Sequence, residues 1–423
     1  MNEKLHNKHG VMLVAAFSVG SDSWWQSKNG PEWVRTENGD CRVTFWWRDP
    51  QGTENHSPIR RVWVYITGVT DHHQNSIPQS MQRLAGTDVW QWSTELSARW
   101  RGSYCFIPSA RDDIFTSLVA GEAPDRTALR EGWRQLLPQA IADPLNPVSW
   151  TGGRGHAVSA LEMPDAPVQP GWDRPEKPDT PPRCLQWRSE RLGNTRRVWV
   201  FTTGKNSGEK RPLAILLDGQ FWAQSMPVWP ALTSLTSRKQ LPAAVYLLID
   251  AIDTPHRSRE LPCNADFWLA VQQELLPQVQ SVAPFSDSPE QTIVAGQSFG
   301  GLSSLYAGLH WPERFGCVLS QSGSYWWPHR GAQQEGIVTE QLKTGAVSAQ
   351  GLRIVLEAGI REPIIFEANQ ALYRQLHNVQ PSVCWRQVDG GHDALCWRGG
   401  LMQGLMTLWQ PLTDPREHQN NQA

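Results

Sequence analysis

The sequence predicts two domains, an antiparallel β-sandwich followed by a doubly wound α/β sheet. Short strand-like segments separated by turns fill the chain from about residue 41 to residue 108. A proline-rich stretch, PDAPVQPGWDRPEKPDTPP, comes later and is typical of an extended connector. Beyond it, wholly apolar runs alternate with helical patterns, as in a sheet covered on both faces by helices. We therefore expect a sandwich domain over residues 19–150, a linker over 151–182 and an α/β domain over 183–412.

The strands expected in the first domain either alternate apolar and polar residues or are rich in β-branched and aromatic residues. They lie at 41–48, 60–68, 89–96 and 101–108. The segment DPQG after the first of them predicts a turn. One short helix is expected within residues 127–141, and the prolines of ADPLNP directly after it exclude regular structure there.

The second domain is expected to contain buried strands and amphipathic helices in alternation. The strands are predicted at 196–204, 211–219, 243–251, 291–296, 317–323 and 352–359. The helices are predicted at 265–281, 301–311, 364–377 and 394–409. Alternation of this kind indicates a mostly parallel sheet with helices on both faces.

Composition and charge argue against several classes of protein. The 39 basic and 41 acidic side chains are nearly balanced, whereas a nucleic-acid binder needs a basic face. The 23 tryptophans predict aromatic packing, with a few rings lining a site. The seven cysteines include no CxxC pair, so neither a disulfide framework nor a zinc site is expected, and a reducing compartment fits.

The N-terminus carries a short apolar run, Gly10–Gly20. This run fits a weak signal segment and fits equally well a start site placed too early, with Met12 as the true initiator. It is shorter than the roughly 20 apolar residues that span a bilayer, so we expect no membrane insertion.

The motif G-Q-S-F-G places Ser298 between a predicted strand, residues 292–295, and a predicted helix. The helix is indicated by apolar residues that recur at helical spacing from Leu302 to Leu309. This order is that of a nucleophile elbow, in which a strained backbone lifts the serine Oγ above the carboxyl edge of the sheet. A serine that caps an ordinary helix is the alternative, but both flanks favour Ser298 as a nucleophile.

His392 is the candidate general base. The expected chain order for such a site is serine, acid, histidine, and His392 follows a strand and two glycines near the end of the chain. We expect His310, His329 and His377 to be structural or exposed instead.

Several carboxylates are candidates for the acid partner of His392. Glu362 is the first choice because it lies in the loop after the strand LRIVLEAG. Glu357 lies within that strand, and Asp389 lies three residues before His392. A serine–histidine dyad without an acid is a further alternative.

Two backbone N–H groups are expected to stabilise an oxyanion. The N–H of Phe299 follows the nucleophile directly. The second donor should come from the loop after an early central strand, where LLDGQFW offers Gln220 or Gly219. Asp218 is expected to shape this turn.

Long motifs make the chain resemble the enterochelin (ferric enterobactin) esterase family from about Val19 to Leu412. The motifs are LLDGQFWAQ, DAIDTPHRSRELPCNADFW, VAGQSFGGLSSLYAGLHWPERFG, SQSGSYWWPHRG, VDGGHDALCWR, SDSWWQSKNGPEW, VTFWWRDPQG and VWVYITGVTDHHQ. The resemblance implies an immunoglobulin-like sandwich that recognises substrate and an α/β-hydrolase domain that cleaves the trilactone of ferric enterobactin. Ser298 and His392 match the family's nucleophile and base.

The same resemblance implies a cytoplasmic enzyme without a cofactor or an enzyme-bound metal, because the iron arrives with the substrate. It also favours a misplaced start site over a signal segment for residues 1–18. The products implied are 2,3-dihydroxybenzoylserine units, and the iron is released.

Ferric tris-catecholate is an anion with aromatic faces, so its pocket should offer guanidinium groups and stacking rings. We expect substrate contacts from side chains that follow strand ends or lie at the domain junction. They are Arg154, Arg257, Arg259, Trp326 and Arg330. Ordinary ion pairs and core packing are the alternative for each of them.

Two other functions compete with this prediction. One is an esterase for another substrate, such as a glucosylated or linear catecholate or a feruloyl sugar. The other is a siderophore- or glycan-binding protein with an inactive hydrolase domain, against which the presence of both Ser298 and His392 argues.

Overall fold

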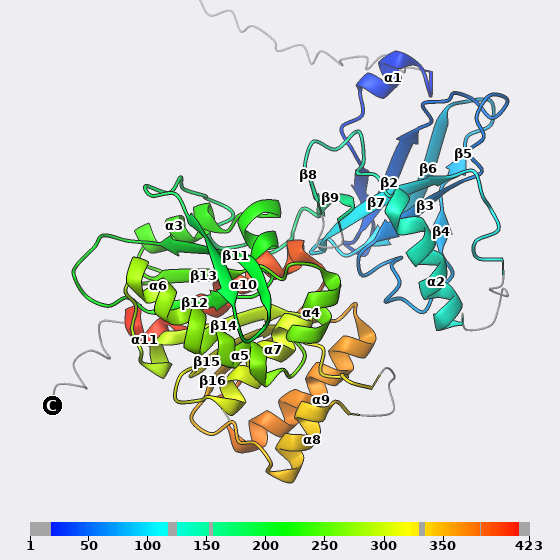
Figure 1. Cartoon of the computed structure of the whole chain (residues 1–423). Helices are drawn as coiled ribbons and strands as arrows, with labels where there is room; N and C mark the ends of the chain where they lie inside the picture. The colour runs from blue at the N-terminus through cyan, green and yellow to red at the C-terminus, as the bar shows by residue number, and fades with distance from the viewer. Residues whose placement is uncertain (1–17, 117–124, 152–154, 330–334, 381, 414–423) are drawn as a thin grey trace, which may run out of the picture.

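The computed structural model describes residues 18–116, 125–151, 155–329, 335–380 and 382–413. Figure 1 shows a β-rich domain, coloured blue to cyan, beside an α/β domain coloured green to red. The prediction of an all-β domain followed by an α/β domain is therefore confirmed. A short helix, α1 (Asp22–Gln26), precedes the first sheet.

Two antiparallel sheets form the described part of the first domain. The four-stranded sheet has the order β1 (Glu32–Arg35), β2 (Cys41–Arg48), β6 (Val89–Leu96) and β5 (Gln82–Arg83). The five-stranded sheet has the order β4 (Gln79–Ser80), β3 (Arg61–Ile66), β7 (Arg101–Ser109), β9 (Ala157–Glu162) and β8 (Ser149–Thr151). Strand β9 lies inside the segment 151–182 that the sequence assigned to a linker, and it pairs with β7.

The core of the sandwich follows from the period-two pattern of its strands. In β2, Cys41, Val43, Phe45 and Trp47 are buried and the residues between them are not. In contrast, β3 is buried at every position from its second residue on. Its outer face is covered by the helix α2 (Arg126–Leu136) and the 3₁₀ turn Leu137–Gln139 that continues it.

The second domain contains a mixed sheet of eight strands within the described residues. Its order is β10 (Arg183–Ser189), β11 (Asn194–Thr202), β13 (Val245–Ile249), β12 (Leu213–Leu216), β14 (Thr292–Gln297), β15 (Cys317–Gln321), β16 (Arg353–Gly359) and β17 (Cys384–Val388). The pairings of β11 with its two neighbours are antiparallel, and every pairing from β13 to β17 is parallel. The carboxyl ends of the parallel strands therefore meet at one edge.

Helices cover both faces of this sheet and enclose two apolar cores. On one face lie α5 (Ala265–Ala270), α6 (Leu276–Val282), α7 (Phe299–His310), α8 (Ile337–Thr344) and α9 (Pro363–Val379). On the other face lie the π-helical turn Phe221–Ser225, α3 (Trp229–Ser237) and α10 (Ala394–Leu408). The remaining short helices are α4 (Thr254–Glu260), α11 (Gln410–Thr413) and the 3₁₀ turn Pro289–Gln291.

The helix predicted over 265–281 contains a π-helical turn, Val271–Leu275, between α5 and α6. Pro277 lies two residues after this turn, and a proline inside a helix lacks an N–H and clashes with the carbonyl four residues earlier. The amide of Leu276 bonds to the carbonyl of Val271, five residues back, which widens the helix just before the proline.

Candidate active site

Ser298 sits at the sharp turn between β14 and α7. Its φ of 57° and ψ of −121° lie in a region that residues other than glycine rarely adopt. The strained conformation is held from both sides, because the Ser298 amide bonds to the Gln321 carbonyl at 3.1 Å and the Leu302 amide bonds to the Ser298 carbonyl at 3.1 Å. Strain of this kind persists where the surrounding structure fixes the backbone, and it is typical of nucleophile elbows.

The glycines around Ser298 differ in how much space they leave for a side chain. A Cβ on Gly296 would lie 2.4 Å from the carbonyl carbon of Gly300, and one on Gly301 would lie 2.7 Å from Ser320 Oγ. In contrast, a Cβ on Gly300 would meet Leu217 Cβ at 3.5 Å, an ordinary contact. The close approach of strand and helix therefore requires Gly296 and Gly301, whereas the motif residue Gly300 has room for a methyl group.

His392 and Glu362 are hydrogen-bonded, with 2.7 Å between Nδ1 and Oε2. Glu362 precedes α9 and is fully buried. Its other oxygen accepts from Ser322 Oγ at 2.5 Å and from the Gly359 amide at 2.8 Å. Burial raises the pKa of Glu362 to about 8, while these two donors act in the opposite direction.

The two other carboxylates considered from the sequence contact different groups. Glu357 accepts from Gln321 Nε2 at 2.8 Å and lies 3.3 Å from Arg386 Nη1. Asp389 accepts from Arg361 Nε at 2.5 Å. The tertiary structure thus places Glu362 against the imidazole Nδ1 of His392.

One short segment after β15 connects Ser298 with the His392–Glu362 pair. Ser324 Oγ lies 3.3 Å from Ser298 Oγ. Two residues earlier, Ser322 donates to Glu362 and accepts from Trp397 Nε1 at 2.9 Å. The Trp397 ring packs edge-on against His392, with 4.7 Å between centroids. All these groups lie at the carboxyl edge of the parallel strands, where α/β sheets bind ligands.

The loop after β12, from which a second oxyanion donor is expected, lies beside the N-terminus of α7. Asp218 has a φ of 52°, and its Oδ2 lies 3.6 Å from the Cβ position of Gly300. Gln220 follows in this loop, and its side-chain oxygen accepts from the Ala251 amide at 3.0 Å. Phe299 is the first residue of α7, so its N–H directly follows Ser298 in the chain.

The arginines and the tryptophan proposed as substrate contacts lie in different surroundings. Arg257 forms a two-pronged ion pair with Asp218, at 2.6 and 2.9 Å, and its guanidinium lies 5.6 Å from the centroid of the Phe299 ring. Arg259 is exposed on α4, and the Trp326 ring lies 6.0 Å from that of Phe299. Arg154 and Arg330 lie outside the described residues.

The first domain contacts the loop that carries His392, and this contact was not predicted from the sequence. The rings of His73 and His392 are 5.1 Å apart. Asp393 accepts from the Ser103 amide at 2.5 Å, and a Cβ on Gly68 would lie 2.9 Å from the Gly391 nitrogen. The contacting residues of the two domains are about 300 positions apart in the sequence, so no local sequence pattern predicts these contacts.

Among the described residues no group of three or more His, Cys, Asp or Glu side chains could hold a metal ion. In the same part of the chain, no helix is both long and apolar enough to cross a bilayer.

The mixed sheet, with a serine at a strained turn on its carboxyl edge, defines an α/β-hydrolase-like esterase domain. Two family models match the chain, "Enterochelin esterase, N-terminal" over residues 42–172 and "Putative esterase" over residues 189–408. The chain belongs to the iron(III) enterobactin esterase family.

Relatives from three sources support this membership. The chain is 74% identical to iron(III) enterobactin esterase of Escherichia coli O6:H1, over 95% of this chain and all of the relative. The crystal structure of ferric enterobactin esterase from Salmonella typhimurium is similar with a TM-score of 0.90 and 75% identity, over 93% of this chain and all of that one. A structure of the Shigella flexneri enterobactin esterase in the presence of enterobactin is similar with a TM-score of 0.88 and 73% identity, over 94% of this chain and all of that one.

Proposed function

We propose that this chain is a serine esterase that hydrolyses the trilactone ester bonds of ferric enterobactin to 2,3-dihydroxybenzoylserine units. The observations that carry the chemistry are the 2.7 Å hydrogen bond between His392 and Glu362 and the strained turn at Ser298. The substrate is supported by relatives at 73 to 75% identity that are named for this activity.

Glu362 fixes the imidazole in the form that a base requires. Nδ1 donates its proton to the ionised carboxylate, so Nε2 carries a lone pair and acts as the proton acceptor. When Nε2 takes up a proton, the nearby carboxylate stabilises the imidazolium. Ser298 supplies this proton as its Oγ attacks the lactone carbonyl.

The reaction proceeds in two halves on each ester bond. In the first, the N–H groups of Phe299 and Gln220 stabilise the oxyanion, the ester C–O bond breaks, and His392 returns the proton to the leaving seryl oxygen. In the second, His392 deprotonates a water molecule that attacks the acyl-enzyme and frees Ser298. Three such cycles open the ring and cut it into its units. The iron is bound by the substrate, and we propose no cofactor or metal for the enzyme itself.

We further infer an immunoglobulin-like sandwich that recognises substrate over residues 19–150, a connector over 151–182 that contributes β9 to a sandwich sheet, and a catalytic domain over 183–412. The two antiparallel sheets packed around one apolar core support the sandwich class. We also propose a cytoplasmic location, which the seven free cysteines support because disulfides are rare in that compartment.

The test is incubation with ferric enterobactin and identification of the products by mass. The Ser298→Ala variant should lose release of dihydroxybenzoylserine, and Ser324→Ala is the matched control because it removes a hydroxyl only 3.3 Å away. Product release by Ser298→Ala at the parent rate would refute the nucleophile assignment. Faster turnover of a glucosylated or linear catecholate than of the cyclic ferric complex would refute the proposed substrate.

A further inference from the structure

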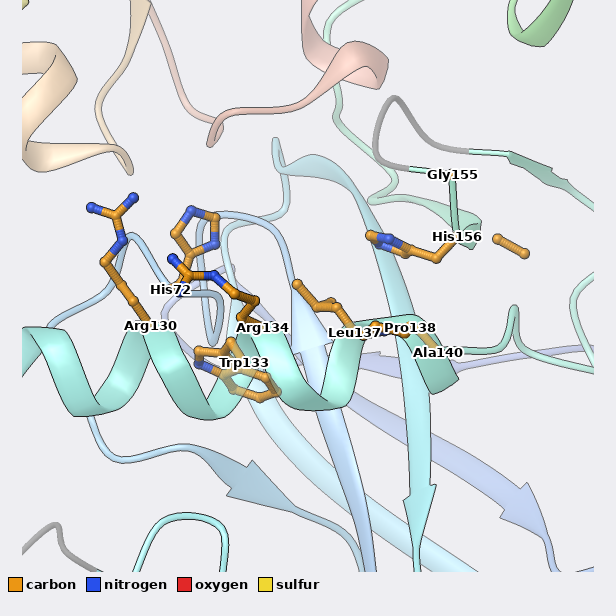
Figure 2. A pocket seen from close by; sticks show the side chains of 10 residues that line it. His72, Arg130, Trp133, Arg134, Leu137, Pro138, Ala140, Gly155 and His156 are labelled. Atoms are coloured by element: carbon orange, nitrogen blue, oxygen red, sulfur yellow. The ribbon is translucent and has the colours of Figure 1, made fainter. Parts of the chain in front are cut away.

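A pocket of about 470 Å³ lies on the sandwich domain, over the face of the five-stranded sheet that α2 covers. Figure 2 shows His72 and the arginines of α2 on one side of the hollow and His156 on the other. We call this hollow the basic pocket. Its lining residues are His72, Arg130, Trp133, Arg134, Leu137, Pro138, Ala140, Gly155, His156 and Ala157.

The basic pocket lies next to the proposed catalytic base. The rings of His72 and His73 are 4.1 Å apart, and those of His73 and His392 are 5.1 Å apart. His72 therefore belongs to the pocket lining and also begins a row of three imidazoles that ends at His392. A ligand that fills the pocket would extend from the sandwich domain toward His392.

The lining combines positive charge with apolar surface. Arg130 and Arg134 are four residues apart on α2, so their side chains share one face of the helix. No carboxylate occurs among the described residues that line the hollow. Arg134 pairs with Glu131 at 2.7 Å, but both side chains are at least half exposed, and exposed pairs of this kind are weak and exchange readily. Trp133 and Leu137 supply an apolar floor.

We propose that the basic pocket binds one catecholate arm of the substrate while an ester bond of the same molecule lies at Ser298. This inference rests on the proposed function. A planar aromatic ring with ionised oxygens matches both features of the lining, because guanidinium groups bind such oxygens and stack on aromatic faces. Arg130 and Arg134 are then specificity residues that favour an anionic catecholate ester over a neutral ester.

The test compares two double variants with the same change of charge. Arg130→Gln with Arg134→Gln removes the two guanidinium groups from the pocket. Arg42→Gln with Arg111→Gln is the matched control, because both arginines are exposed on the same domain, pair with Glu95 and Asp113, and do not line the pocket. Each charge-assisted contact is worth about 1.5 kcal/mol or more, so loss of both should raise KM for ferric enterobactin at least about a hundredfold in the pocket variant alone.

Two readouts separate this proposal from the proposed function. Hydrolysis of a neutral aryl ester such as p-nitrophenyl butyrate should be unchanged, because that ester has no arm to fill the pocket. Binding of ferric enterobactin, measured by tryptophan quenching in the Ser298→Ala background, should weaken by a similar factor and does not depend on turnover. Equal KM values and equal binding in the pocket and control variants would overturn the proposal, even if the esterase activity is established.

Discussion

Replacement of Gly68 by alanine should impair catalysis from the other domain. Gly68 has a φ of +80°, and an added Cβ would lie 2.9 Å from the nitrogen and 3.0 Å from the Cα of Gly391. Ordinary contacts of a Cβ begin near 3.4 Å, so the loop before His392 must move by roughly half an ångström. A misplacement of about 1 Å can cost about a hundredfold in rate, and we therefore expect kcat to fall about tenfold.

The matched control is Gly86→Ala. Gly86 has a φ of +72°, and no atom lies within 4 Å of its Cβ position. Both variants place alanine in the left-handed region, at a cost of about 1 to 2 kcal/mol in the free energy of unfolding. Their melting temperatures should therefore fall by similar amounts, to which Gly68→Ala adds the cost of its contact.

The assay is hydrolysis of p-nitrophenyl butyrate, which reports on the catalytic residues without a contribution from the siderophore arms. Only Gly68→Ala should lose kcat, since only its Cβ meets the loop that carries His392. Equal kcat values for the two glycine variants would refute the inference that the first domain positions the proposed base.

Three further predictions concern the residues around Ser298. Glu362→Gln should lower kcat for the aryl ester by about 10³- to 10⁴-fold, because an amide N–H directed at Nδ1 stabilises the wrong imidazole tautomer. A loss below tenfold would argue for a serine–histidine dyad. Burial raises the pKa of Glu362 to about 8, so the carboxyl takes up a proton as the pH falls and can no longer accept from Nδ1–H. A pH–rate profile should therefore show kcat decreasing below about pH 8, and a rate constant that stays level down to pH 5 would contradict this. Gly296→Ala should abolish activity, because its Cβ would lie 2.4 Å from the nearest atom, whereas Gly300→Ala, with its nearest atom at 3.5 Å, should retain most activity. Similar losses of activity in both variants would show that the elbow is less tightly packed than described.

The local sequence pattern predicted most of the regular structure. Strands β2 and β6 lie at the predicted residues, and β7, α7 and α10 begin and end within about two residues of prediction. The apolar residues recur with a period of two in strands and of 3.6 in helices, because each element buries the side chains on one of its faces. This periodicity can be read directly from the sequence. The short strands β4, β5 and β8 were not predicted, since two or three residues carry no readable period and their pairing is fixed by the neighbouring strand.

The sequence by itself determined the order of the two domains and the sharp turn at Ser298, because a strand, a turn and a helix are encoded by adjacent residues. It also predicts His392 as the base. Only the tertiary structure decided that Glu362, rather than Glu357 or Asp389, meets His392. It also decided that Gly68 abuts the His392 loop and that α2 carries a basic pocket beside it. The physical reason is that these contacts join segments far apart along the chain, and their distances are set by how the sheets and domains pack.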